Sequence, residues 1–181
     1  MYTENLYSLV IRDGDIVYDV GANIGQTVEQ LNKLPVNIKK IYTFEPHPTI
    51  YKSLLNNISK LNNCNIESHC VALSDQVGTT SFYFGEDDSA QAASTIIEYL
   101  ANTERLGSKI TEIKVDTTTV DEFSKSEYPN FIKIDVEGAE LQVIRGMPKC
   151  LEIARPTIYF EIGHDNNYKP CLLYTSDAAD E

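Results

Sequence analysis

A carboxylate inside an apolar run is the first feature of this sequence that suggests chemistry. In "IVYDVGANIG", residues 16–25, Asp19 lies within the apolar run, which ends at Gly21 and Gly25. Burying an ionised carboxylate without a partner is costly. Asp19 therefore needs a partner, and the sequence leaves open whether a protein group or a ligand supplies it.

The two glycines are typical of a turn that binds a nucleoside. Gly21 can adopt backbone angles closed to other residues, and Gly25 lets the following helix begin close to a ligand. Glu45 ends the next apolar run about 20 residues after the glycines, where an acid can accept hydrogen bonds from ribose hydroxyls. The alternative is a plain tight turn, with Glu45 as a solvated strand end.

Asp19 and Asn23 separate the possible cofactors. A pyrophosphate turn needs G-x-G-x-x-G, but Asn23 replaces the middle glycine here, and the Asp19 carboxylate would repel an anion. An ammonium or sulfonium group would be attracted, and S-adenosylmethionine has both. We expect its amino group near Asp19, its ribose at Glu45 and its adenine near the end of the third strand, around Val71, Ala72 and Leu73. A nicotinamide dehydrogenase and a binding-only fragment remain as alternatives.

A second group of acids occurs in "IDVEGAE", residues 134–140. Asp135 ends the predicted fourth strand, and Glu137 follows in the turn. Two carboxylates at a strand mouth can position a substrate or remove its proton, so Asp135 or Glu137 is the candidate base. Glu140 is expected to stabilise the start of a helix. His164 is a rival base and His47 a possible neighbour of the ribose, whereas no metal site is assigned because hard cations need more oxygen ligands.

The elements that position these residues alternate between strands and helices, which predicts an α/β fold with a mostly parallel sheet and helices on both faces. Strands are expected at residues 15–20, 40–45, 65–73, 131–136 and 157–162. Helices are expected at residues 25–34, 49–61 and 139–146. Two further strands, 79–84 and 112–116, are expected to flank a polar segment, 85–109, whose structure the sequence does not decide.

Length and charge limit the class of protein. The chain has 181 residues and 42% hydrophobic content, which suits one domain. Its net charge of −12 argues against nucleic-acid binding, because nucleic-acid readers present a basic face. With neither a signal peptide nor a membrane span evident, we expect a cytoplasmic protein.

Five segments resemble the FkbM family of class I methyltransferases: "VYDVGANIG", "TFEPHP", "VALSDQVGTTSFY", "TTTVDEF" and "FIKIDVEGAELQVIRGM", followed by "PTIYFEI". The resemblance implies a Rossmann-like fold and an S-adenosylmethionine-dependent O-methyltransferase that acts on a hydroxyl of a sugar, glycan or natural-product intermediate. It also implies cofactor contacts at Asp19, Gly21, Asn23, Gly25 and Glu45.

The C-terminus departs from the family pattern. Residues 171–181, "CLLYTSDAADE", resemble a translated sequencing adapter, so the domain is expected to span residues 1–170 and to be incomplete. Such methyltransferases usually add two more strands, one of them antiparallel. Without them, the strand at residues 157–162 would be an exposed apolar edge that invites self-association.

Overall fold

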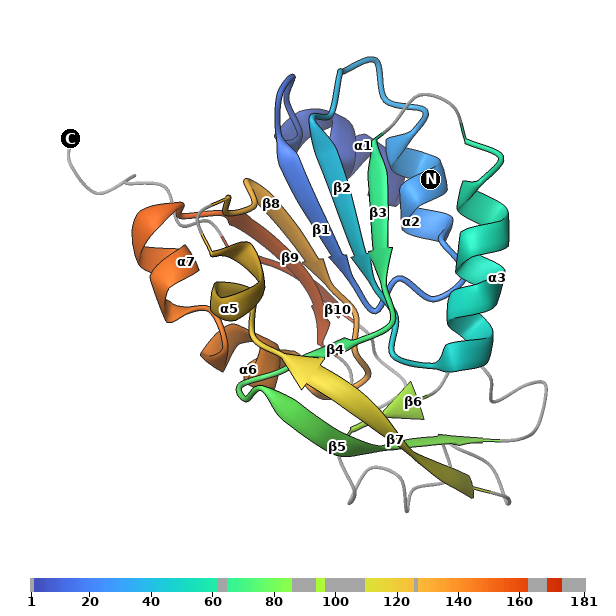
Figure 1. Ribbon diagram of the computed structural model, residues 1–181. Helices are drawn as coiled ribbons and strands as arrows, with labels where there is room; N and C mark the ends of the chain where they lie inside the picture. Colours follow the sequence, from blue (N-terminus) through green and yellow to red (C-terminus); the bar gives the residue numbers. More distant parts are fainter. Residues whose placement is uncertain are drawn as a thin grey trace.

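The computed structural model describes residues 2–61, 65–85, 94–96, 110–125, 127–162 and 169–173. Its main sheet has six strands in the order β10-β9-β8-β1-β2-β3 (Figure 1). All neighbouring pairs are parallel except β9 with β10. From one edge to the other the strands are β10 (Lys169–Leu173), β9 (Thr157–Ile162), β8 (Phe131–Ile134), β1 (Ile16–Val20), β2 (Lys40–Phe44) and β3 (Ile66–His69).

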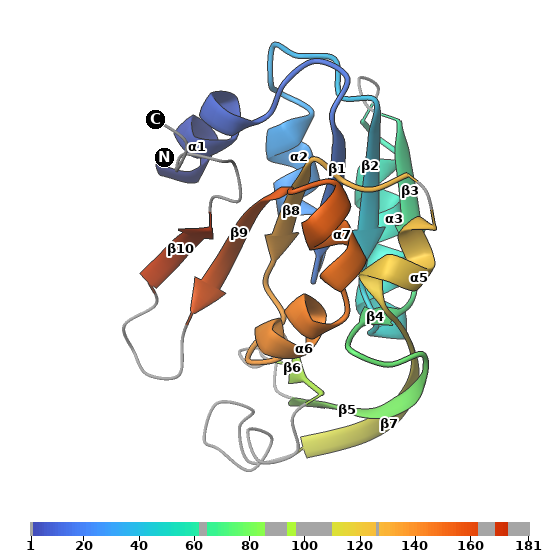
Figure 2. The same cartoon turned by 90° about the vertical axis from the view of Figure 1, so that its left-hand side faces the viewer.

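Helices cover both faces of this sheet, as the alternating pattern predicts. Helices α1 (Tyr2–Val10), α2 (Gln26–Leu31) and α3 (Pro48–Ile58) cover one face, and α5 (Val120–Ser124), α6 (Glu140–Arg145) and α7 (Pro148–Ile153) cover the other. Figure 2 shows α7 in front of the strands. The sequence predicts the three helices that directly follow β1, β2 and β8 but not α1, α5 or α7.

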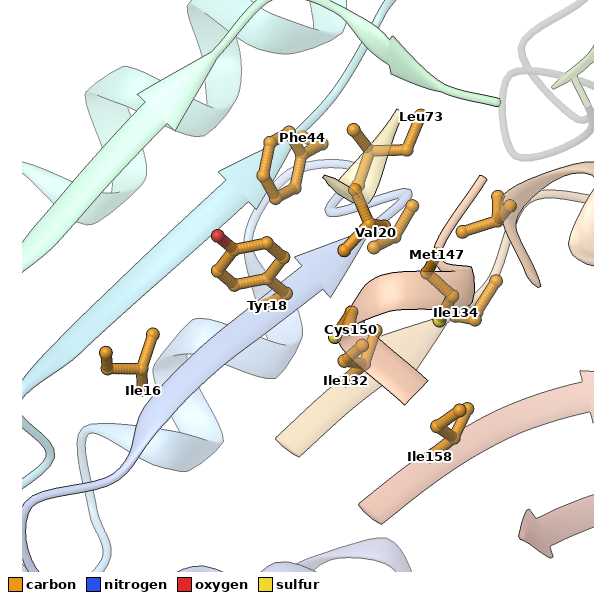
Figure 3. Close-up of a cluster of buried hydrophobic side chains, with 12 residues drawn as sticks. Ile16, Tyr18, Val20, Phe44, Leu73, Ile132, Ile134, Met147, Cys150 and Ile158 are labelled. Atoms are coloured by element: carbon orange, nitrogen blue, oxygen red, sulfur yellow. The ribbon is translucent and has the colours of Figure 1, made fainter. Parts of the chain in front are cut away.

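The strand alternation sorts side chains between two cores. Val17 and Phe131 pack with Tyr7 of α1 and Val28 of α2 on the first face. On the other face, twelve buried side chains from β1, β2, β4, β8, β9 and α5–α7 form one cluster (Figure 3). Residues 17, 19, 131 and 133 alternate with the residues of this second cluster, so Asp19 and Lys133 face the α1 and α2 side.

The predicted strand at residues 65–73 is in fact two strands in different sheets. Its first half is β3, and its second half, β4 (Ala72–Leu73), pairs with β7 (Ile110–Thr118). A second sheet has the order β4-β7-β5-β6, with β5 (Gly78–Gly85) and β6 (Ser94–Thr95), and it lies across the carboxyl ends of the main strands (Figure 1). Ala72 turns into this sheet because it packs there against Phe82 and Val115. Of the polar segment 85–109, only residues 85 and 94–96 are described.

The expected exposed edge at Thr157–Ile162 is wrong, because β10 pairs antiparallel along the length of β9. Residues 171–173, assigned from sequence to a foreign tail, take part in this pairing. The other residues of that tail lie outside the described ranges. Within those ranges, no helix combines the length and apolar content that crossing a bilayer requires.

Asp121 joins α5 to α7 and provides a stability prediction. Its two carboxylate oxygens accept hydrogen bonds from the backbone N–H groups of Lys149 and Cys150, at 2.9 and 2.8 Å. Losing a side chain that caps a helix start costs about 1 kcal/mol, with a range of roughly 0.5–2. We therefore expect Asp121→Ala to lower the free energy of unfolding by about that amount in urea titrations. The neighbouring exposed Glu122→Ala should change it by less than about 0.5 kcal/mol, and equal losses in both variants would contradict the capping role.

Candidate cofactor and acceptor pocket

A pocket of about 310 Å³ opens where the main sheet meets the second sheet, and this volume is in the range of small-molecule sites. It lies beyond the carboxyl ends of β1, β2 and β8, the place where open parallel sheets bind ligands. Seven of the nine predicted site residues line it: Gly21, Asn23, Glu45, Ala72, Leu73, Asp135 and Glu137. Asp19 and Gly25 do not line it.

Gly21 shapes the pocket floor by letting two strands approach closely. Its φ is +79°, and a Cβ atom built there would lie 1.8 Å from the backbone oxygen of Asp135. The Gly21 and Ala22 N–H groups both donate to the carbonyl oxygen of Phe44, at 3.0 Å. The turn after β1 is thus fastened to β2 while it touches the end of β8, and only glycine fits this position.

Gly25 lies at the start of α2, next to α3. Its φ is +94°, and a Cβ atom there would lie 2.9 Å from Leu54 and 3.4 Å from Ile58, both on α3. The absence of a side chain at Gly25 therefore allows the start of α2 to pack against α3. The expectation that it also brings α2 close to a ligand stays a prediction.

Glu45 links two loops beneath the pocket and is only 5% exposed. Its Oε2 accepts a hydrogen bond from the Asn23 N–H at 3.0 Å, and its Oε1 accepts one from the His47 N–H at 2.9 Å. Burial raises the pKa of Glu45 to about 7, and the two backbone hydrogen bonds only partly oppose that rise. Because a carboxylate oxygen has two lone pairs, each oxygen can accept a further hydrogen bond from the pocket.

The partner of Asp19 is a protein group. Asp19 is fully buried, and the Nζ of Lys133 lies 3.6 Å from its Oδ1. Lys133 and Asp19 are register partners in the β1–β8 pairing. Burial raises the pKa of Asp19, while Lys133 opposes the rise. The expectation that the amino group of a ligand meets Asp19 directly therefore needs correction, because Lys133 already provides the cation.

Lys133 also contacts a pocket residue. Its Nζ donates a 3.1 Å hydrogen bond to Oδ2 of Asp135, whose side chain is 34% exposed. Burial alone would lower the pKa of Lys133, but the two carboxylates hold it above its ordinary value. Lys133 is therefore an ammonium at neutral pH. Lys133 was missed in the sequence, although its i, i+2 spacing with Asp135 places both on one face of the strand.

The turn after Asp135 is built from two residues with left-handed backbone angles. Glu137 has φ +52° and Gly138 has φ +103°. A left-handed conformation is unfavourable for a residue with a side chain. The Gly138 N–H donates to Oε1 of Glu140 at 3.0 Å, so Glu140 supports the turn at the start of α6, as its sequence position suggests. This turn places Glu137 in the pocket wall.

Apolar side chains line the opposite wall: Val71, Ala72, Leu73, Phe82 and Ile96. His47 does not line the pocket. Its Nδ1 accepts from the Thr49 N–H at the start of α3, and its ring packs edge-on against Phe84, with ring centroids 4.2 Å apart. His164, the rival base, lies outside the described residues. Phe82 and Ile96 were also missed in the sequence, because only the pairing of the second sheet brings them to the pocket.

The fold matches that of known structures. The mostly parallel, helix-covered sheet is that of Rossmann-like class I methyltransferases. A methyltransferase FkbM from Methylobacillus flagellatus KT superimposes with a TM-score of 0.59 at 17% identity, over 83% of this chain and 33% of that one. A putative methyltransferase from Streptococcus mutans, solved in complex with S-adenosylhomocysteine (SAH), gives a TM-score of 0.52 at 11% identity, over 90% of this chain and 70% of the other.

The sequence comparison gives the family. The model of the methyltransferase FkbM domain matches residues 19–179, and this chain belongs to that family. The hexuronic acid methyltransferase AglP of Haloferax volcanii is 32% identical over 143 residues, which cover 77% of this chain. The chain spans 53–59% of the length of the curated relatives it matches.

Proposed function

We propose that this domain is part of an S-adenosylmethionine-dependent methyltransferase that acts on a hydroxyl group of a sugar, glycan or related small molecule. The observation that carries the proposal is the buried Glu45 carboxylate at the pocket, beside an apolar wall. This pairing suits a nucleoside, with ribose hydroxyls at Glu45 and the adenine against Ala72 and Leu73. Membership of the FkbM family and the SAH complex of the Streptococcus neighbour support this choice of cofactor.

The acceptor is proposed from different observations. The relative AglP is named for hexuronic acid, which supports a sugar acceptor. The net charge of −12 favours a small molecule over a nucleic acid. Asp135 or Glu137, on the wall nearest β8, is proposed to meet the acceptor.

The chemistry follows from positioning and proton removal. When bound, S-adenosylmethionine would supply a methyl group that passes from its sulfonium sulfur to the acceptor oxygen, and the thioether S-adenosylhomocysteine would be the leaving group. The pocket contributes by holding both partners in place, and such alignment is worth about 7–11 kcal/mol in favourable cases. Asp135 or Glu137 would accept the proton of the hydroxyl, a contribution of typically 10²–10⁴-fold.

Calorimetry tests the cofactor proposal. We expect S-adenosylhomocysteine to bind the full chain with a micromolar to sub-millimolar dissociation constant, and NADH to give no heat. Transfer of a labelled methyl group from S-adenosylmethionine to a panel of neutral sugars and hexuronic acids then tests the acceptor. Binding of NADH without binding of S-adenosylhomocysteine would overturn the proposal.

A further inference from the structure

Lys133 is a buried charged group near the pocket that the proposed chemistry does not use. It lies on β8 between Asp19 on β1 and Tyr159 on β9, its two register partners. Its side chain is 12% exposed. Tyr7 of α1 covers this part of the sheet and packs edge-on against Phe131 and Tyr159. Placing an ammonium in such surroundings is costly unless it is paired.

The two carboxyl groups around Lys133 are not equivalent. Asp135 makes the shorter contact, a 3.1 Å hydrogen bond, whereas Asp19 is 3.6 Å away and neither of its oxygens has a hydrogen-bond partner among the described residues. Asp19 is fully buried, but Asp135 lines the pocket. Lys133 therefore links the buried Asp19 to Asp135, which lines the pocket.

This bridge leaves one oxygen of Asp135 for a ligand. Oδ2 is bonded to Lys133, and no described residue donates a hydrogen bond to Oδ1. The backbone N–H of Asp135 is itself fixed to the carbonyl oxygen of Val20 at 2.9 Å. With its backbone and Oδ2 held, the carboxylate presents Oδ1 to the pocket as an acceptor that no described residue occupies.

We propose that Lys133 is a positioning residue that orients the Asp135 carboxylate to receive the α-ammonium group of the cofactor's amino-acid moiety. This inference rests on the proposed function and deepens it. The charges of Asp19, Lys133, Asp135 and the ligand ammonium then alternate in sign from the buried Asp19 to the pocket, so each charge has an opposite neighbour. Asp135 takes over the role first expected of Asp19, and Glu137 is left as the carboxylate for proton removal.

Two ligands separate this role from a structural one. S-adenosylhomocysteine carries the amino-acid moiety, whereas 5′-methylthioadenosine has the same nucleoside and lacks it. Calorimetry on the full chain should show that Lys133→Met weakens S-adenosylhomocysteine at least tenfold and 5′-methylthioadenosine less than threefold. Lys133→Arg, which keeps the cation, should retain most of the preference for S-adenosylhomocysteine. Lys40→Met is the matched control, because Lys40 pairs with the exposed Glu67 at the other end of β2, and it should change neither affinity.

A second variant covers the case in which Lys133→Met does not fold because Asp19 is left buried and unpaired. Asp19→Asn with Lys133→Met removes both charges, and Asp19→Asn alone keeps the bond from Lys133 to Asp135. We expect the preference for S-adenosylhomocysteine to be at least tenfold lower in the double variant than in Asp19→Asn. Equal losses for both ligands, or an unchanged preference, would overturn the role of Lys133. If the unaltered chain binds neither ligand, the proposed function itself fails.

Discussion

Gly21→Ala is expected to abolish S-adenosylhomocysteine binding and to destabilise the fold strongly. The added Cβ atom would lie 1.8 Å from the Asp135 oxygen, and that backbone cannot move freely because its N–H is bonded to Val20. Left-handed backbone angles cost a residue with a side chain about 1–2 kcal/mol. The overlap adds roughly 1–3 kcal/mol, so a loss of about 2–5 kcal/mol in the free energy of unfolding is expected.

Gly14 offers a matched control for this change. Its φ is +83°, close to that of Gly21, but a Cβ atom there meets nothing within 4 Å. Gly14→Ala should therefore show only the backbone cost, about 1–2 kcal/mol, and should bind S-adenosylhomocysteine as the unaltered chain does. Urea unfolding and calorimetry on both variants provide the measurement. If the two variants lost the same free energy, the close contact between β1 and β8 would not matter.

The main sheet could be predicted from the sequence because local patterns specify it. Short apolar runs bounded by turn residues give the positions of β1, β2, β8 and β9 to within two residues. The stripe Ile50, Leu54 and Ile58 predicts α3 for the same reason, since its spacing fits one helix face. Two of the helices that were missed are short: α5 and α7 have five and six residues.

Pairing between distant segments could not be predicted in the same way. Residues 65–73 look like one strand, and only the contact of Ala72 with Phe82 and Val115 explains why the chain changes sheets. The second sheet depends on the pairing of β4 with β7, whose partner residues, such as Ala72 and Thr117, are 45 positions apart, and no local pattern encodes that pairing. The apolar wall formed by Phe82 and Ile96 was missed for this reason.

The site shows the same division between local and long-range information. Glu45, Asp135 and Glu137 could be placed from their positions at strand ends. The partner of Asp19 could not, because Lys133 is 114 positions away and reaches Asp19 only through the β1–β8 register. The role of Gly25 likewise depends on how α3 packs against α2. A carboxylate in an apolar run correctly indicates a buried ion pair, but it does not say whether the cation is a ligand or a lysine.

Glu45 should make cofactor binding depend on pH. Its pKa of about 7 means that the carboxyl group is protonated below this pH, whereas ribose hydroxyls donate best to an ionised carboxylate. Affinity for S-adenosylhomocysteine is therefore expected to rise with pH, by up to about tenfold per unit below pH 7, and to level off above it. Calorimetry between roughly pH 5.5 and 8.5, on both sides of this pKa, measures how the affinity changes with pH.

The same titration also affects stability, with the opposite sign. Between pH 4.5 and about 7 the unfolded chain loses the Glu45 proton while the folded chain keeps it. The Glu45 contribution to the free energy of unfolding therefore falls as the pH rises through this window, by about 3 kcal/mol at 1.36 kcal/mol per pKa unit. Above pH 7 it stays constant. Loss of one proton from Glu45 would thus explain both the tighter binding and the lower stability over this pH range.

Glu45→Gln removes that proton and should flatten both pH profiles. The amide keeps only one oxygen for the N–H groups of Asn23 and His47, and it cannot match a carboxylate as an acceptor. Since hydrogen bonds to charged groups contribute about 1.5–3 kcal/mol, affinity at pH 8 should fall by roughly 10- to 100-fold. Glu127→Gln, at an exposed carboxylate paired with Lys39, is the control and should keep the affinity and its pH dependence. A Glu45→Gln variant with the affinity and pH profile of the unaltered chain would show that the ribose does not contact this carboxylate. The affinity of any ligand that accepts or donates a hydrogen bond at Glu45 must change when Glu45 gains or loses its proton, because its pKa lies near 7.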